Sequence, residues 1–269
     1  MKIREHLPLV EAPESIWASI EAALEAKERR RWPSLRWRLA FAVLAISMIA
    51  GTLWWRVAGR DHWIQTGANA GLTLRIGDIG SVEVGPNTRV RVVADRVDQH
   101  RLDLAHGAIY ARISAPPRLF FVETHSGTAV DLGCEYGLTM DADGAGLLRV
   151  SRGWVSFEWQ QLESLVPAGA ECRIAPGGGP GIPYFEDAPE AFKNALKNLD
   201  LERVLDSARV RDTLSLWHLI SRVAPGDRAR VFDRIAALSP PPEDISREQA
   251  LKLDPETLRR WREELAWTW

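Results

Sequence analysis

The sequence predicts a mainly β domain, either a sandwich or a barrel-like fold, with one transmembrane helix before it and an α-helical region after it. Three observations carry this fold class. A charge-free apolar run lies inside the chain from Leu39 to Trp55. Eighteen of the twenty glycines fall between Gly59 and Gly181, and residues 62–185 contain ten arginines but no lysine. Because glycine favours turns and is avoided inside helices, we expect strands in this middle region and helices on its two flanks.

The composition excludes several classes of protein. The 269 residues include 34 Lys and Arg against 36 Asp and Glu, a formal charge of -2. Nucleic-acid binders usually carry a clear basic excess, so no nucleic-acid partner is expected. An apolar content of 46% with 26% charged residues is typical of a folded chain. Two cysteines are too few for a disulfide scaffold or a four-cysteine zinc site.

The charge-free run reads LAFAVLAISMIAGTLWW. As a helix it would extend roughly 26 Å, slightly less than a ~30 Å hydrocarbon core. Tryptophan is favoured at the two membrane interfaces, and arginine side chains extend from there toward water. We therefore predict a transmembrane helix over residues 37–58 in contact with membrane lipid. Its predicted anchors are Trp37, Arg38, Trp54, Trp55 and Arg56.

The basic residues around this run predict its orientation. Six precede it closely and two follow it: Lys27, Arg29, Arg30, Arg31, Arg36 and Arg38, then Arg56 and Arg60. The positive-inside rule then places the N-terminus in the cytoplasm. A cleaved signal peptide and a buried soluble helix are the alternatives. The first has a short basic start, whereas 38 residues precede this run. The second would show a polar face, whereas this run is apolar all round.

The cytoplasmic segment, residues 1–36, contains a predicted amphipathic helix. Residues 13–28 read PESIWASIEAALEAKE, with apolar side chains at spacings of three and four and glutamates opposite them. A lone helix of about four turns is marginal in water, so docking on a partner protein is the functional interpretation. The alternative is that the helix lies on the membrane surface or frays, although interfacial helices favour basic polar faces. The candidate partner-binding residues are Ile16, Trp17, Ile20 and Leu24.

Residues 62–185 alternate apolar and polar side chains, as half-buried strands do. Val82 and Val84, for example, alternate with polar neighbours. Asp143–Gly144 lies between two apolar stretches and predicts a hairpin turn. Turn signals recur roughly every 8–12 residues, which favours a sandwich or closed barrel of about ten strands.

Residues 187–269 predict a helical domain. They hold fourteen Lys and Arg and fifteen Asp and Glu, the mixture expected on solvated helix faces. We expect four or five helices, and the segment APEAFKNALKNLDLERVL places Phe192, Leu196, Leu199 and Val204 along one broad helical face. Asp254 before Pro255 is a favourable start for the last helix. Four tryptophans are interpreted as packing residues rather than a ligand cage: Trp217, Trp261, Trp267 and Trp269.

Five segments within residues 66–175 occur in a family-specific order: GDIGSVEVGPNTRV, LDLAHGAIYARI, FFVETHSGTAVDLGCEYGL, VSRGWVSF and LVPAGAE. These segments follow directly after one predicted membrane helix, and together they resemble the FecR-type domain of membrane-bound anti-sigma regulators. The resemblance implies a bacterial inner-membrane protein with its C-terminus in the periplasm. It also implies two partners, an extracytoplasmic-function sigma factor on the cytoplasmic side and an unknown periplasmic signal or envelope protein. The sequence departs from the family pattern at Gly133–Cys134, where Gly-Thr is usual.

No motif predicts catalysis, a cofactor or a metal ion, so the protein is not expected to be an enzyme. The six histidines include no H-x-H, no H-E-x-x-H and no pair at i,i+4. Asp141 and Asp143 mimic the start of a calcium loop, but the later ligands are missing. Cys134 and His125 lack an orienting acid and oxyanion donors.

Cys134 and Cys172 both lie beyond the membrane run on strand-like segments. In an oxidising periplasm they could form a disulfide, and the alternative is two buried free thiols.

Two functional hypotheses remain. The first is an anti-sigma factor that holds its sigma factor until an envelope signal arrives. The second is a membrane-anchored envelope- or glycan-binding β-module without a role toward a sigma factor.

Overall fold

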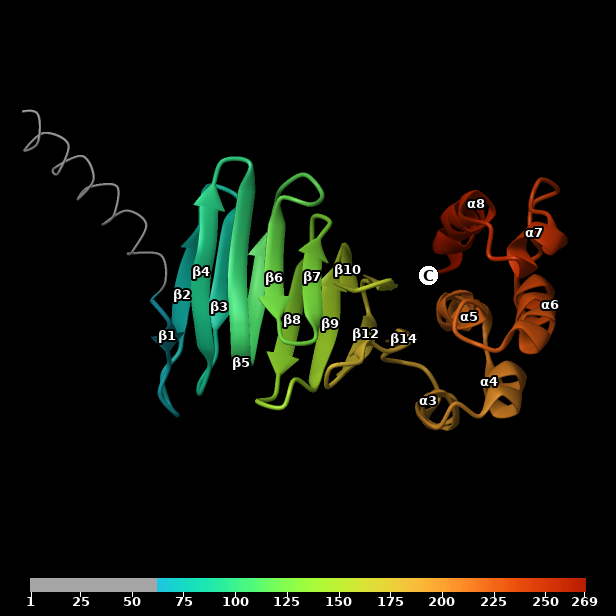
Figure 1. Ribbon diagram of the computed structural model, residues 1–269, viewed down its shortest axis with the longest axis horizontal. Helices are drawn as coiled ribbons and strands as arrows, with labels where there is room; N and C mark the ends of the chain where they lie inside the picture. Colours follow the sequence, from blue (N-terminus) through green and yellow to red (C-terminus); the bar gives the residue numbers. More distant parts are fainter. Residues whose placement is uncertain (1–61) are drawn as a thin grey trace, which may run out of the picture. The chain divides into compact units, whose positions relative to one another are not determined.

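The computed structural model describes residues 62–269, which lie in the second of the chain's two compact units, Arg60–Trp269 (Figure 1). No helix within these residues is long and apolar enough to cross a lipid bilayer. The predicted cytoplasmic segment 1–36 and the predicted transmembrane helix 37–58 lie outside the described residues.

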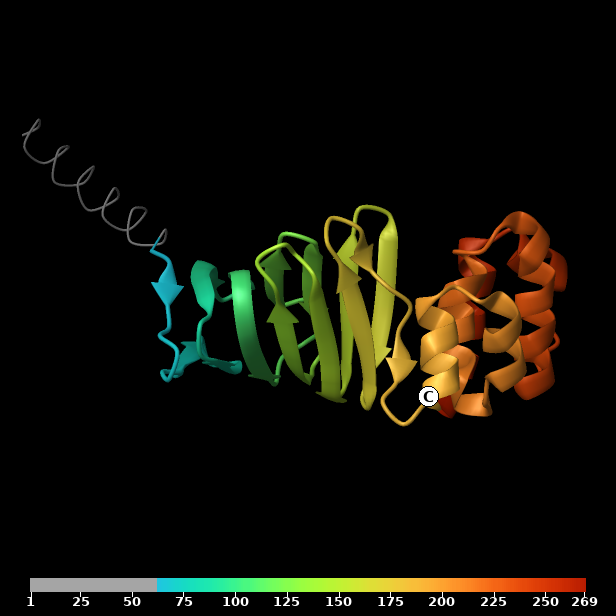
Figure 2. The same ribbon diagram turned by 90° about the horizontal axis from the view of Figure 1, so that it is seen from below.

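Fourteen strands form one nearly closed, barrel-like sheet (Figures 1 and 2). Their bounds are β1 (Ile64–Gln65), β2 (Leu72–Ile76), β3 (Gly80–Val84), β4 (Arg89–Arg96), β5 (Gln99–Ile113), β6 (Phe120–Thr124), β7 (Gly127–Asp131), β8 (Glu135–Met140), β9 (Gly146–Arg152), β10 (Trp154–Trp159), β11 (Leu162–Pro167), β12 (Ala170–Ala175), β13 (Gly179–Pro180) and β14 (Tyr184–Phe185). The number exceeds the ten expected because three of the strands, β1, β13 and β14, have only two residues.

The long strand β5 joins the two halves of the sheet. Its first part pairs with β4 and β6, and its second part pairs with β3 and β8. One half runs β1-β4-β5-β6-β7-β10-β11, and the other runs β2-β3-β5-β8-β9-β12, with β13 and β14 both on β12. Gly107 lies between the two parts of β5 with φ +99, and a Cβ there would lie 2.3 Å from Thr88 Oγ1. Only glycine fits this close approach without displacing Thr88.

The predicted alternation of apolar and polar side chains is confirmed in strand β3. Val82 and Val84 are fully buried inside the barrel, whereas Glu83 between them faces outward. The hairpin predicted at Asp143–Gly144 connects β8 and β9. Gly144 has φ +90, and its amide donates to the Asp141 carbonyl at 3.0 Å. Period-2 patterning and turn chemistry thus specify these strands locally.

Six α-helices follow the strands. They are α3 (Glu190–Lys197), α4 (Leu201–Ser207), α5 (Thr213–Ile220), α6 (Arg228–Leu238), α7 (Arg247–Leu251) and α8 (Pro255–Leu265). The expected Asp254 cap is confirmed, since its carboxylate accepts a hydrogen bond from the Thr257 amide at 2.9 Å. The prediction of one broad helical face over residues 188–205 is wrong. Leu199 adopts φ +54 and separates α3 from α4, and Asp200 then caps α4 by accepting from the Arg203 amide.

The helices bury a second core, distinct from the core inside the barrel. Trp261, Phe192 and Leu216 are its largest fully buried members. Trp269 packs against both cores. Trp267 is 89% exposed, so its interpretation as a packing residue is wrong.

Candidate functional site

Helix α5 covers the free edge of strand β11, which pairs only with β10 among the described strands. The imidazole of His218 bridges the two elements. Its Nε2 accepts from the Leu165 amide of β11 at 3.0 Å, and its Nδ1 donates to the Leu214 carbonyl at 2.9 Å. Both bonds require the neutral tautomer that carries its proton on Nδ1. Burial lowers the pKa of His218 to about 3, so the ring stays neutral near pH 7.

Arg222, four residues after His218, also covers this edge of β11. Its guanidinium donates to the Glu163 carbonyl and the Ser164 hydroxyl of β11, at 3.2 and 2.7 Å. It also donates to the Pro180 carbonyl of β13 at 2.7 Å. Burial lowers the pKa of Arg222, and no carboxylate within residues 62–269 forms an ion pair with it. The sequence offers no signal for this pair, because His218 in α5 and Arg222, two residues after its end, both contact β11 more than 50 residues earlier in the chain.

The C-terminal residue Trp269 fixes the helices to the strands at a second point. Its ring centroid lies 5.9 Å from that of Trp154 on β10 and 6.4 Å from that of Trp217 on α5. The Trp269 indole N–H donates to Thr213 Oγ1 at 3.0 Å. The helical region is therefore attached to the last strands through both polar and aromatic contacts.

Beside this junction, strand β12 and helices α3, α4 and α5 enclose a cleft of about 850 Å³. Ile174, Ile182, Leu196, Leu201, Val204 and Leu219 supply much of its apolar lining. Leu199 lies at its rim with 73% of its surface exposed. The cleft is thus built from segments spread between Glu171 and Asp227 in the chain.

The acidic side chains of this cleft are each paired. Glu171 accepts from Arg149 Nε at 2.8 Å. Although its burial acts in the opposite direction, hydrogen bonds from Arg149 and Tyr184 hold the pKa of Glu171 below its usual value. Glu190 lies 2.6 Å from Lys193, and Asp227 lies 3.5 Å from Arg230.

Three cations of the cleft have no such partner within the described part of the chain. The Arg173 guanidinium donates only to the Tyr184 hydroxyl, at 3.1 Å. The Lys197 ammonium makes no ion pair or hydrogen bond to residues 62–269. Arg222 binds only neutral oxygens, as described above. The cleft therefore combines apolar walls with three cations that form no ion pair within the described residues.

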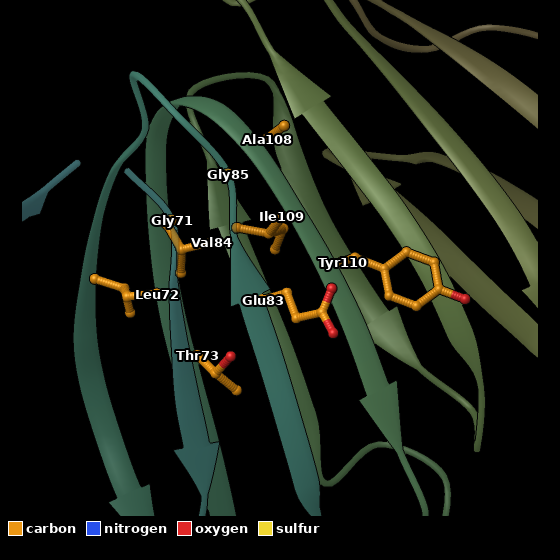
Figure 3. A pocket seen from close by; sticks show the side chains of 9 residues that line it. All are labelled: Gly71, Leu72, Thr73, Glu83, Val84, Gly85, Ala108, Ile109 and Tyr110. Atoms are coloured by element: carbon orange, nitrogen blue, oxygen red, sulfur yellow. The ribbon is translucent and has the colours of Figure 1, made fainter. Parts of the chain in front are cut away.

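A second hollow, of about 410 Å³, lies at the opposite end of the strand order, over β2, β3 and β5 (Figure 3). Leu72, Val84 and Ile109 lie in register across these strands. Its one carboxylate, Glu83, is paired with Arg112. Since this hollow has about half the volume of the cleft and its one carboxylate is paired, we consider the cleft the stronger candidate.

Residues 62–156 match the family described as FecR protein. The chain contains a FecR domain. The match confirms the family resemblance found in the sequence. It ends within β10, so strands β11 to β14, the helices and the cleft all lie beyond the matched residues.

Two crystal structures of a proposed anti-sigma factor from Parabacteroides distasonis are similar to this chain. One is 14% identical with a TM-score of 0.42 and covers 54% of this chain and 73% of that one. The other is 15% identical, also with a TM-score of 0.42, and covers 54% of this chain and 75% of that one. No curated protein matches the sequence.

Cys134 and Cys172 are both free and buried. Cys134 donates to Asp131 Oδ2 at 2.6 Å, and burial raises its pKa. Burial also raises the pKa of Cys172, to about 12. Cys172 lies opposite Leu148 on β9, which lies opposite Leu138 on β8, four residues beyond Cys134. Two strand spacings and four residues separate the Cα atoms by on the order of 15 Å, about twice the reach of a disulfide.

The remaining predicted site residues lie outside the described residues. They are the partner-binding candidates Ile16, Trp17, Ile20 and Leu24 and the membrane anchors Trp37, Arg38, Trp54, Trp55 and Arg56. Within residues 62–269, no three His, Cys, Asp or Glu side chains lie close enough together to hold a metal ion.

Proposed function

We propose that this protein is a single-pass inner-membrane regulator of the FecR type, which binds an extracytoplasmic-function sigma factor and transmits an envelope signal to it. The observation that carries the proposal is the FecR domain at residues 62–156, which begins shortly after the charge-free run Leu39–Trp55. The proposed role is regulatory binding without catalysis.

The charge distribution supports the proposed orientation. Six basic residues lie within the twelve positions before the run, and two lie within the five positions after it. The positive-inside rule then gives a cytoplasmic N-terminus and a periplasmic FecR domain. In this arrangement residues 1–36 face the compartment that contains sigma factors.

The amphipathic pattern of residues 13–28 supplies the proposed contact with the sigma factor. Ile16, Trp17, Ile20 and Leu24 form one apolar stripe. Each large side chain that becomes fully buried contributes about 1.5–3 kcal/mol before the cost of ordering the segment. Four such side chains suffice for a reversible contact of roughly micromolar affinity.

The contacts between the strands and the helices support one folded unit on the periplasmic side, in which the helical region is attached to the strands. His218, Arg222 and Trp269 connect the helical region to β10, β11 and β13 by hydrogen bonds and ring contacts. A partner or ligand that binds near this junction therefore acts on the strands that continue from the FecR domain.

The proposal is tested with the double variant Trp17→Ala/Ile20→Glu in the full-length protein. Losing about 3 kcal/mol of apolar contact weakens binding by more than about a hundredfold. We expect transcripts of one sigma-factor regulon to rise, while the amount of protein in the membrane fraction stays unchanged. Glu25→Gln, which lies outside the apolar stripe and is not an i,i+3 or i,i+4 neighbour of Trp17 or Ile20, is the matched control and should leave the transcripts unchanged. Identical transcript profiles in the double variant and the wild type would favour an envelope-binding module instead.

A further inference from the structure

The cleft between β12 and helices α3, α4 and α5 has the dimensions of a small-molecule site. Its volume of about 850 Å³ falls within the range of about 300–1,000 Å³ that is usual for such sites. Leu196, Val204 and Leu219 contribute buried apolar surface from three different helices. Walls of this kind favour a ligand with an apolar body.

The charged side chains of the cleft indicate which charge its ligand carries. Each of its three acids forms an ion pair, whereas Arg173, Lys197 and Arg222 form none within residues 62–269, although the charge of Arg173 also acts on Glu171. Arg222 is also largely removed from solvent, with its guanidinium bound only to neutral oxygens. A partly buried cation without a counter-ion is unfavourable, so an anion in the cleft gains more there than in water.

The backbone around the cleft argues against an extended peptide as the occupant. Strand β12 pairs with β9 on one side, and β13 and β14 pair with its other side. Between them, the Gly181 amide donates to the Arg173 carbonyl at 2.7 Å. Peptides that add to a sheet need an unpaired strand edge, and β12 offers none.

We propose that this cleft binds an amphipathic organic anion, with its apolar chain against Leu196, Val204 and Leu219 and its carboxylate near Arg173, Lys197 and Arg222. The inference rests on the cleft alone and does not depend on the proposed sigma-factor contact. The cleft lies beyond the residues of the FecR match, so this site is additional to the FecR domain.

The test uses the full-length protein in lipid nanodiscs and octanoate as the probe. An environment-sensitive fluorophore is attached through Leu199→Cys, at the rim of the cleft. The same label on Val97→Cys is the control, because Val97 is 96% exposed in the β4–β5 turn, far from the cleft in strand order. We expect a saturable emission change at position 199 only. Octanamide, which has the same chain without the charge, should bind at least about tenfold more weakly.

Two variants connect this binding to the cleft. Arg173→Gln/Lys197→Gln removes two exposed cations and should weaken octanoate binding about tenfold or more. Asn194→Asp places a carboxylate on an exposed lining position without changing side-chain size, and this variant should also bind octanoate more weakly than the wild type. Arg96→Gln, in the β4–β5 region, is the matched control and should bind octanoate like the wild type. Equal affinities for octanoate and octanamide, or equal responses at positions 97 and 199, would overturn the proposal.

Discussion

Acid should destabilise the fold through His218, and the size of the effect follows from its burial. The side chain is 2% exposed, and burial lowers its pKa from about 6.5 to about 3. The unfolded chain therefore binds a proton between these two values while the folded chain does not. The stability that the neutral ring supports is fully present above pH 6.5 and is lost as the pH falls below it. Between pH 7.5 and pH 5.0 this linkage amounts to about 2 kcal/mol of unfolding free energy.

The assay is guanidinium unfolding of residues 60–269, followed by tryptophan fluorescence at pH 7.5 and 5.0. His218→Gln keeps an oxygen that can accept from the Leu165 amide but has no titrating group. We expect the drop in unfolding free energy between the two pH values to be about 2 kcal/mol smaller in this variant than in the wild type. His125→Gln, at an exposed hairpin tip, should retain the wild-type pH dependence. The reasoning would be refuted by an equal pH dependence in the His218 variant and the wild type.

Two further predictions concern the tryptophans and the cysteines. Trp269→Ala removes ring contacts to both cores and the hydrogen bond to Thr213, so it should lower the unfolding free energy by about 2–4 kcal/mol in the same denaturant titration. Trp267 is exposed, so Trp267→Ala should change the unfolding free energy by less than about 0.5 kcal/mol. Equal effects of the two substitutions would contradict the assigned packing. Cys134 and Cys172 should both react with N-ethylmaleimide in denaturant without reductant and neither should react in the folded protein, because both thiols are buried and free; mass spectrometry of the intact chain counts the labels, and an absence of label in denaturant would indicate a disulfide.

The strands were predictable because their signals are local. Val82 and Val84 face the core as their alternation with polar neighbours predicts, and Asp143–Gly144 forms the hairpin that this dipeptide favours. The break between α3 and α4 was not predictable, because leucine rarely adopts positive φ and Leu199 carries no turn signal.

The candidate site was not predictable, because it depends on tertiary contacts. His218 lies in the apolar stretch TLSLWHLI, and its partner Leu165 is 53 residues earlier. Trp267 and Trp269 are both C-terminal tryptophans in sequence, yet one is solvent-exposed and the other contacts both cores. Which face of an element is covered depends on the neighbour it packs against, and a single sequence does not contain that information.

The central claim is the contact between residues 13–28 and a sigma factor. Its most direct measurement is affinity purification of the tagged full-length protein from the membranes of its own host after mild crosslinking, with mass spectrometry of the bound proteins. We expect one extracytoplasmic-function sigma factor in near-equal amount with the wild-type chain, and its loss from a chain that lacks residues 13–28. Recovery of envelope proteins or glycan without any sigma factor, from both chains alike, would contradict the account.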